Sequence, residues 1–166
     1  MESWTIDLGF PLNWELKLRF NPLPNRPTPC FVKGGRWFRA FRLEGRLIPV
    51  MVEALGSIDK PKLKISTIKM PSREKRELED LIFKIHGLRD CSDLYSFMDR
   101  DRVLRKIRHK LYGFGGAGLM AATVFEGLVK SIIQQQISIK VAQNITANLV
   151  ERFGEHLKFM GEAVYD

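Results

Sequence analysis

The spacing of apolar residues changes near Pro71, and this change constrains the fold more than any other feature of the chain. Before Pro71, short runs of aromatic and β-branched residues are separated by glycine and proline, a pattern typical of strands joined by turns. Strict alternation of polar and apolar residues at 15–20 indicates a strand with one solvated face. Glu44-Gly45 predicts a hairpin turn. Strands are therefore expected at residues 4–8, 15–20, 37–43, 47–52 and 63–68.

After Pro71, apolar residues recur at helical spacing. Helices are expected from Ser72, acting as the cap, to Gly87, after Ser92, after Asp99 or Asp101, from Thr123 to about Gln135, and from Ser138 to Gly154. Thr123 and Glu126 match a capping box, in which each side chain accepts a backbone N–H of the first turn. Two apolar stripes are expected to be buried, one formed by Phe125, Leu128, Val129, Ile132 and Ile133, the other by Ala142, Ile145, Leu149 and Phe153. The chain is thus predicted to be α+β, with an antiparallel β-sheet N-terminal domain at 1–70 and a helical domain at 71–166.

The chain is strongly basic, with a net charge of +8 and a pI near 9.7. This excess of positive charge favours a polyanionic partner, most commonly nucleic acid. The alternatives are an anionic membrane surface as the partner, or a charge that serves only to keep the protein soluble. Apolar runs are too short for a membrane span, and the first residues do not resemble a secretory signal. We therefore expect a cytoplasmic protein, nucleoid-associated if prokaryotic. Cys30 and Cys91 form no C-x-x-C pair, so neither a metal nor a cofactor is expected.

The most informative segment runs from residue 125 to 138 and reads FEGLVKSIIQQQIS. It describes a helix that ends in three glutamines and turns sharply into a second helix, whose N-terminus Ser138 caps. Unpaired amides at such an N-terminus suit a phosphate. An uncharged amide such as that of Gln136, beside a phosphate site, suits insertion between stacked bases. The plainer alternative is that the glutamines merely end a helix.

This pattern, F-E-x-L-V-x-x-I-I-x-Q-Q-I-S followed by a helix that ends in F-G-E, resembles the helix-hairpin-helix DNA glycosylases, and within them the 3-methyladenine and 8-oxoguanine branches. The specific part of the resemblance covers residues 123–154. It implies a DNA-repair hydrolase of base excision, which flips a damaged base out of duplex DNA and fills the gap with a wedge side chain. By this resemblance Gln136 is the wedge, Gln135 supports the turn or contacts the opposite base, and Ser138 offers its amide to a phosphate.

The sequence departs from the family's pattern at its end. No segment matches the glycine-rich hairpin, the catalytic aspartate or the lysine of the bifunctional branch. The helical bundle is therefore expected to be incomplete, the chain truncated and inactive by itself, with no catalytic residue. Expected partners are double-stranded DNA with a damaged base and a missing C-terminal half, without which an apolar face would lie uncovered. The alternatives are a non-catalytic DNA-binding or regulatory remnant, and an interaction domain whose basicity is incidental.

Two further basic groups carry competing interpretations. Six cations crowd one predicted helix, Arg100, Arg102, Arg105, Lys106, Arg108 and Lys110. Arg105 and Arg108 are the candidates for contacts with DNA phosphates, although the charges could form only a solvated face. In the sheet, arginines alternate with Trp37, Phe38 and Phe41, which suits either a single-strand binding surface or a core. Alternation splits these aromatic residues between the two faces, and this favours a core.

Overall fold

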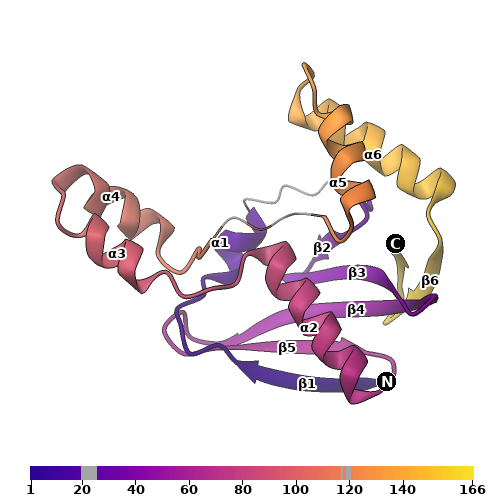
Figure 1. The fold of residues 1–166 in the computed structure, drawn as a ribbon, viewed down its shortest axis with the longest axis horizontal. Coiled ribbons are helices and arrows are strands. Elements are labelled where there is room, and N and C mark those ends of the chain that lie inside the picture. The colour runs from indigo at the N-terminus through magenta and orange to yellow at the C-terminus, as the bar shows by residue number, and fades with distance from the viewer. Residues whose placement is uncertain (20–25, 117, 119–120) are drawn as a thin grey trace.

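Five antiparallel strands form a sheet in the order β1-β5-β4-β3-β2 (Figure 1). The computed structural model describes residues 1–166 except 20–25, 117 and 119–120. The strands are β1 (Glu2–Asp7), β2 (Phe31–Lys33), β3 (Arg36–Leu43), β4 (Arg46–Gly56) and β5 (Pro61–Thr67). Four of them match expected strands, β2 was not expected, and β3 and β4 pair from Trp37↔Val52 to Leu43↔Arg46 around the predicted turn. The predicted α+β class is confirmed.

The expected strand at 15–20 is wrong, because Trp14–Arg19 forms helix α1 and Phe20 lies outside the described residues. The side chain of Asn13 accepts a hydrogen bond from the Leu16 amide at 3.0 Å and so holds the first turn. Trp14 and Leu18, one helical turn apart, are buried. The alternation seen in the sequence is compatible with either element, and packing of these two side chains selects the helix.

One face of the sheet is covered by α2 (Ser72–His86), as Figure 1 shows. Its buried Leu78 and Ile82 join Trp37 and Phe41 in the main core. The helix ends as expected at Gly87, in the left-handed conformation with φ 60°. The expected cap is wrong: Ser72 is the first helical residue, and Pro71 precedes it without a side-chain hydrogen bond.

The opposite face of the sheet is partly covered by a hairpin that the sequence did not predict, formed by β6 (His156–Phe159) and β7 (Glu162–Tyr165). Phe159 and Val164 of this hairpin pack with Phe38, Ala40 and Met51. Aromatic residues on both faces are therefore buried in a core. The alternative of a single-strand binding surface on Trp37, Phe38 and Phe41 is wrong.

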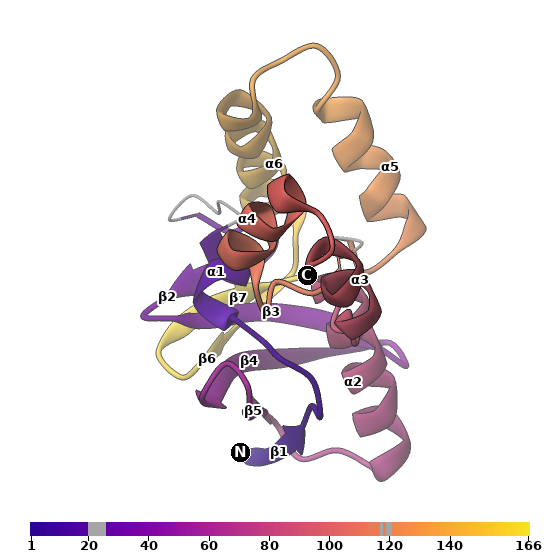
Figure 2. The same cartoon turned by 90° about the vertical axis from the view of Figure 1, so that its left-hand side faces the viewer.

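The remaining helices form two pairs that extend from the sheet on different sides (Figures 1 and 2). One pair is α3 (Ser92–Met98) and α4 (Arg102–Leu111), and the other is α5 (Val124–Ile133) and α6 (Ile139–Phe153). The expected burial of the apolar stripes is wrong for most positions. No residue of α5 is buried, Phe125 is 77% exposed and Phe153 71%, and α6 buries only Ala142, Thr146 and Ala147.

An uncovered apolar face, expected from the resemblance, is therefore present on α5 and α6. Its members are Phe125, Leu128, Ile132, Ile145, Leu149 and Phe153. Within the described residues, no helix is long and apolar enough to cross a membrane.

Candidate nucleic-acid interface

The turn between α5 and α6 presents the three glutamines at the end of the helix pair remote from the sheet (Figure 1). α5 ends at Ile133, Gln134 follows as its C-cap, and the Gln135 amide donates to the Ile132 carbonyl at 3.2 Å. Gln136 has φ 57°, a left-handed backbone rare for residues other than glycine. The side chains of Gln135 and Gln136 are exposed. Gln136 therefore lies at the chain reversal itself, beyond the C-terminal end of α5.

Ser138 caps α6 as expected. Its hydroxyl oxygen accepts a hydrogen bond from the Val141 amide at 3.3 Å. Ile139 and Lys140 at the same N-terminus are exposed. A helix N-terminus of this kind, in a 15-residue helix, carries partial positive charge. The turn thus places the uncharged, exposed side chain of Gln136 close in sequence to the partially positive N-terminus of α6.

Arg105 and Arg108 lie on α4 and are engaged within their own helix pair. Arg105 Nε donates to the Asp99 carbonyl at 3.1 Å. The Arg108 guanidinium lies 4.8 Å from the Tyr112 ring centroid and 3.7 Å from a carboxylate oxygen of Asp99. Arg108 therefore packs inward, whereas three other cations of α4, Arg102, Lys106 and Lys110, are exposed.

The structure does not bring all predicted site residues together. Gln135, Gln136 and Ser138 lie on the α5–α6 turn, whereas Arg105 and Arg108 lie on α4, which belongs to the other helix pair (Figure 1).

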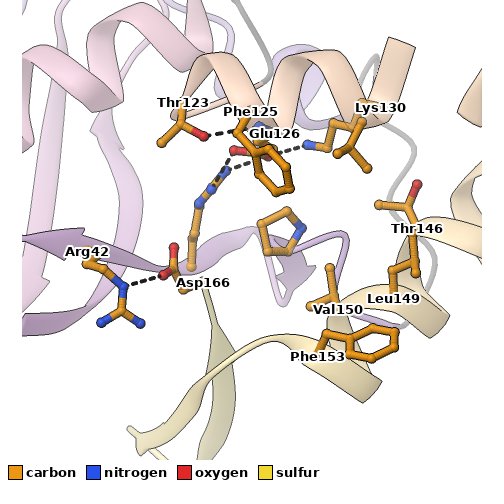
Figure 3. A pocket seen from close by; sticks show the side chains of 13 residues that line it. Arg42, Thr123, Phe125, Glu126, Lys130, Thr146, Leu149, Val150, Phe153 and Asp166 are labelled. Carbon is orange, nitrogen blue, oxygen red and sulfur yellow. Dashed lines mark hydrogen bonds and ion pairs between the residues drawn. The ribbon is translucent and has the colours of Figure 1, made fainter. Parts of the chain in front are cut away.

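A cavity of about 560 Å³ opens between α5, α6, β3 and the C-terminal residue (Figure 3). Its walls are largely apolar and include Phe125, Val129, Leu149, Val150 and Phe153. Charged groups line the rest, namely Arg39, Arg42, Glu126, Lys130 and Asp166.

Glu126 is the most buried acid of this cavity, and the sequence did not reveal its main partner. The expected capping box is half confirmed: Thr123 Oγ1 accepts from the Glu126 amide at 3.1 Å. The Glu126 carboxylate, however, accepts from the Ala122 amide at 2.6 Å, from Arg39 at 2.7 and 3.1 Å and from Lys130 at 2.6 Å. No local signal points to Arg39, which lies 87 residues away.

Burial raises the pKa of Glu126, but the charges and hydrogen bonds of Arg39 and Lys130 outweigh it and lower the pKa to about 2. The carboxylate is ionised, and four donors occupy it. The other acid of the cavity, Asp166, accepts from Arg42 Nε at 3.2 Å (Figure 3). Among the described residues, no group of three or more His, Cys, Asp or Glu side chains could hold a metal ion.

Comparison with known proteins identifies related folds. A family model described as AfAlkA-like, TATA-box binding protein-like domain matches residues 3–60. No curated protein matches the chain. A solved structure of 3-methyladenine DNA glycosylase from Archaeoglobus fulgidus is similar with 40% identity and a TM-score of 0.89, over 98% of this chain and 55% of that one.

Two further structures share the fold at lower identity. They are MBOgg1 in complex with a low-affinity DNA ligand, and the 8-oxoguanine glycosylase/lyase of Clostridium acetobutylicum in its apo form. Identity is 19% and 18%, each TM-score is 0.63, and the matches cover 99% of this chain in both cases and 54% and 52% of the other chains. The chain thus spans about half the length of the structures it matches. It is similar to the N-terminal part of a 3-methyladenine DNA glycosylase, and it shares its fold with the corresponding part of 8-oxoguanine glycosylases.

Proposed function

We propose that the chain acts in base-excision repair as the N-terminal part of a DNA glycosylase that excises damaged bases by base flipping. The observation that carries this proposal is the similarity to the 3-methyladenine DNA glycosylase, at 40% identity over almost the whole chain. The DNA ligand of MBOgg1 supports DNA as the partner. Its place of action would be the cytoplasm, or the nucleoid of a prokaryote.

The α5–α6 turn is the proposed point of DNA contact. Gln136 would enter the space left by a flipped base, Gln135 would support the turn or contact the opposite base, and the α6 N-terminus at Ser138 would bind a phosphate. Exposure of all three residues and the reversal of the chain at Gln136 support this arrangement. The exposed cations of α4 would add a separate, sequence-independent phosphate contact.

On this proposal, cleavage of the glycosidic bond requires a further part of the enzyme that carries the catalytic residue. The four donors on Glu126 and the arginine on Asp166 leave neither acid of the cavity available to face a sugar. A helical C-terminal half would supply the hairpin and the catalytic aspartate, and its apolar side would cover the exposed face of α5 and α6. The observed exposure of that face supports such an occupant.

A second candidate is a DNA-binding module that performs no excision. The full occupation of Glu126 by its partners favours it for the chain by itself. The two functions differ in whether binding prefers a lesion and in whether any base is released.

The test compares binding of undamaged duplex DNA and of a duplex with an abasic-site analogue, by fluorescence anisotropy. For the glycosylase function we expect tighter binding of the abasic duplex, and loss of that preference in Gln136→Ala. Gln134→Ala is the matched control, since Gln134 is an exposed C-cap of α5 two positions earlier and is not the proposed wedge. Equal binding of both duplexes by the wild type would favour the non-catalytic module.

A second assay measures release of 3-methyladenine from alkylated duplex DNA. We expect none with the chain alone and measurable release after its co-expression with the C-terminal part of the Archaeoglobus fulgidus enzyme. Release by the chain alone would contradict the proposal that its cavity lacks an available carboxylate.

A further inference from the structure

Helix α5 is attached to the sheet through charge rather than through apolar packing. None of its residues is buried, and in the described part of the chain its extensive contacts with other elements are made with α6. The cavity of about 560 Å³ lies beside it, so no layer of side chains fills the space between α5, α6 and β3. The Glu126 carboxylate of α5 reaches the sheet and accepts hydrogen bonds from Arg39 of β3.

The contact between Glu126 and the sheet has a defined geometry. Arg39 stands on β3 with a side chain only 3% exposed, and its two terminal nitrogens donate to the two carboxylate oxygens at 3.1 and 2.7 Å. Such a two-point contact constrains orientation as well as distance. Lys130, one helical turn along α5, donates to the same carboxylate from Glu126's own face of the helix (Figure 3).

A second arginine attaches α6, but in a different environment. Arg26 donates to Glu151 at 2.9 Å and to Asn148 at 2.7 Å. Both side chains of this ion pair are more than a third exposed, so solvent and salt weaken it. The side chains of the Arg39–Glu126 pair are much less exposed, at 3% and 15%. Removal of one partner of such a pair leaves the other as an uncompensated charge.

We propose that Arg39 is a positioning residue, which holds Glu126 and thereby sets the direction of α5 and the place of the α5–α6 turn relative to the sheet. A helix rises about 1.5 Å per residue, so the turn begins roughly 12 Å beyond Glu126. A tilt of about 20° at Glu126 would therefore displace Gln136 by roughly 4 Å, more than a hydrogen bond tolerates. The consequence for DNA rests on the proposed function, whereas the direction of α5 does not.

The structural test measures a distance between spin labels at Thr5→Cys on β1 and Ser131→Cys near the end of α5, both exposed positions. Cys91 is replaced by serine in every sample, and the fully buried Cys30 is retained. We expect one narrow distance distribution in the parent protein and a broad or shifted one in Arg39→Ala and in Glu126→Gln. If Arg39→Ala does not fold, Glu126→Gln decides, because the amide keeps the shape of the side chain.

Arg46→Ala is the matched control. Arg46 of β4 forms a similar ion pair with the buried Glu74, which belongs to α2 and not to α5. Its loss should leave the label distance unchanged. An unchanged distribution in both Arg39→Ala and Glu126→Gln would overturn the proposal.

The functional test repeats the abasic-duplex measurement with the same variants. We expect the preference for the abasic duplex to fall about tenfold in Arg39→Ala and Glu126→Gln, equivalent to one well-placed contact, and to persist in Arg46→Ala. A wild type without any preference would refute the proposed function, and the label distances would still decide the role of Arg39. Variants with altered distances but full preference would overturn the link between α5 and DNA.

Discussion

His86 at the end of α2 lies between two tryptophans, with its ring centroid 4.7 Å from that of Trp37 and 4.9 Å from that of Trp14. Its Nε2 atom is buried and has no hydrogen-bond partner among the described residues. Burial, together with the charges of Lys17 and Arg39, lowers the pKa of His86 to about 3. A neutral imidazole is therefore part of the core.

This burial predicts a sensitivity to mild acid. Below the ordinary pKa of 6.5, the unfolded chain binds a proton at His86 that the folded chain does not, so the free energy of unfolding falls as pH falls from 6.5 towards 3. We expect a loss of roughly 2 kcal/mol between pH 7 and pH 5, from about 1.4 kcal/mol per pKa unit. Urea unfolding followed by tryptophan fluorescence measures it.

A His86→Leu variant should lose most of this slope above pH 5. Glu126, whose pKa is lowered to about 2, adds its own loss only below its ordinary value of 4.5, so the two groups are separated by pH. A wild-type slope that persists in His86→Leu would assign the acid sensitivity elsewhere.

Lys17 of α1 predicts a second stability effect. Its ammonium donates to the carbonyls of Phe114 and Gly116 at 2.7 and 2.6 Å, and burial lowers its pKa to about 8. Lys17→Met leaves two carbonyls without this donor and should lower the free energy of unfolding by roughly 2 kcal/mol. Hydrogen exchange at residues 113–116 should accelerate, while the exposed Lys69→Met, as a control, should change neither quantity.

Ser138 allows helix stability and DNA binding to be separated. Aspartate is also a good N-cap and its charge suits the helix dipole, so Ser138→Asp should keep the stability of α6 within about 0.5 kcal/mol or raise it. The same charge should repel a DNA phosphate and weaken binding. Thr123→Asp, at the cap of α5 away from the turn, is the control that should leave DNA affinity unchanged. Equal effects of both variants on affinity would argue against a phosphate at Ser138.

The exposed cations of α4 should contribute salt-dependent affinity. Lys106→Ala and Lys110→Ala should each weaken binding to any duplex and reduce the slope of log affinity against log salt by about 1. Arg108→Ala should instead loosen α4, because its guanidinium lies against the Tyr112 ring. Binding titrations at several salt concentrations, with circular dichroism for folding, distinguish the two results. Unchanged slopes for both variants would show that neither lysine contacts a DNA phosphate.

Local signals in the sequence determined much of the fold. The change of period at Pro71 separated sheet from helices, Glu44-Gly45 located the hairpin of β3 and β4, and Thr123 and Ser138 were recognised as caps. Each depends on residues a few positions apart, so the chain's own backbone chemistry decides it. The resemblance to DNA glycosylases was likewise visible in residues 123–154, and the structural comparisons confirm it. The DNA roles of Gln135, Gln136, Ser138, Arg105 and Arg108 stay predictions.

Tertiary structure decided the rest, because the deciding contacts join residues far apart in the sequence. Alternation at 15–20 suited a strand, and burial of Trp14 and Leu18 against the core made it a helix. The apolar stripes of α5 and α6 predicted burial, but most of their residues are exposed. Whether such a stripe is buried depends on which other element packs against it, and the stripe itself does not specify that element. No sequence pattern predicts that Glu126 pairs with Arg39, 87 residues away. A single ion pair of this kind depends only on where folding brings the two side chains together.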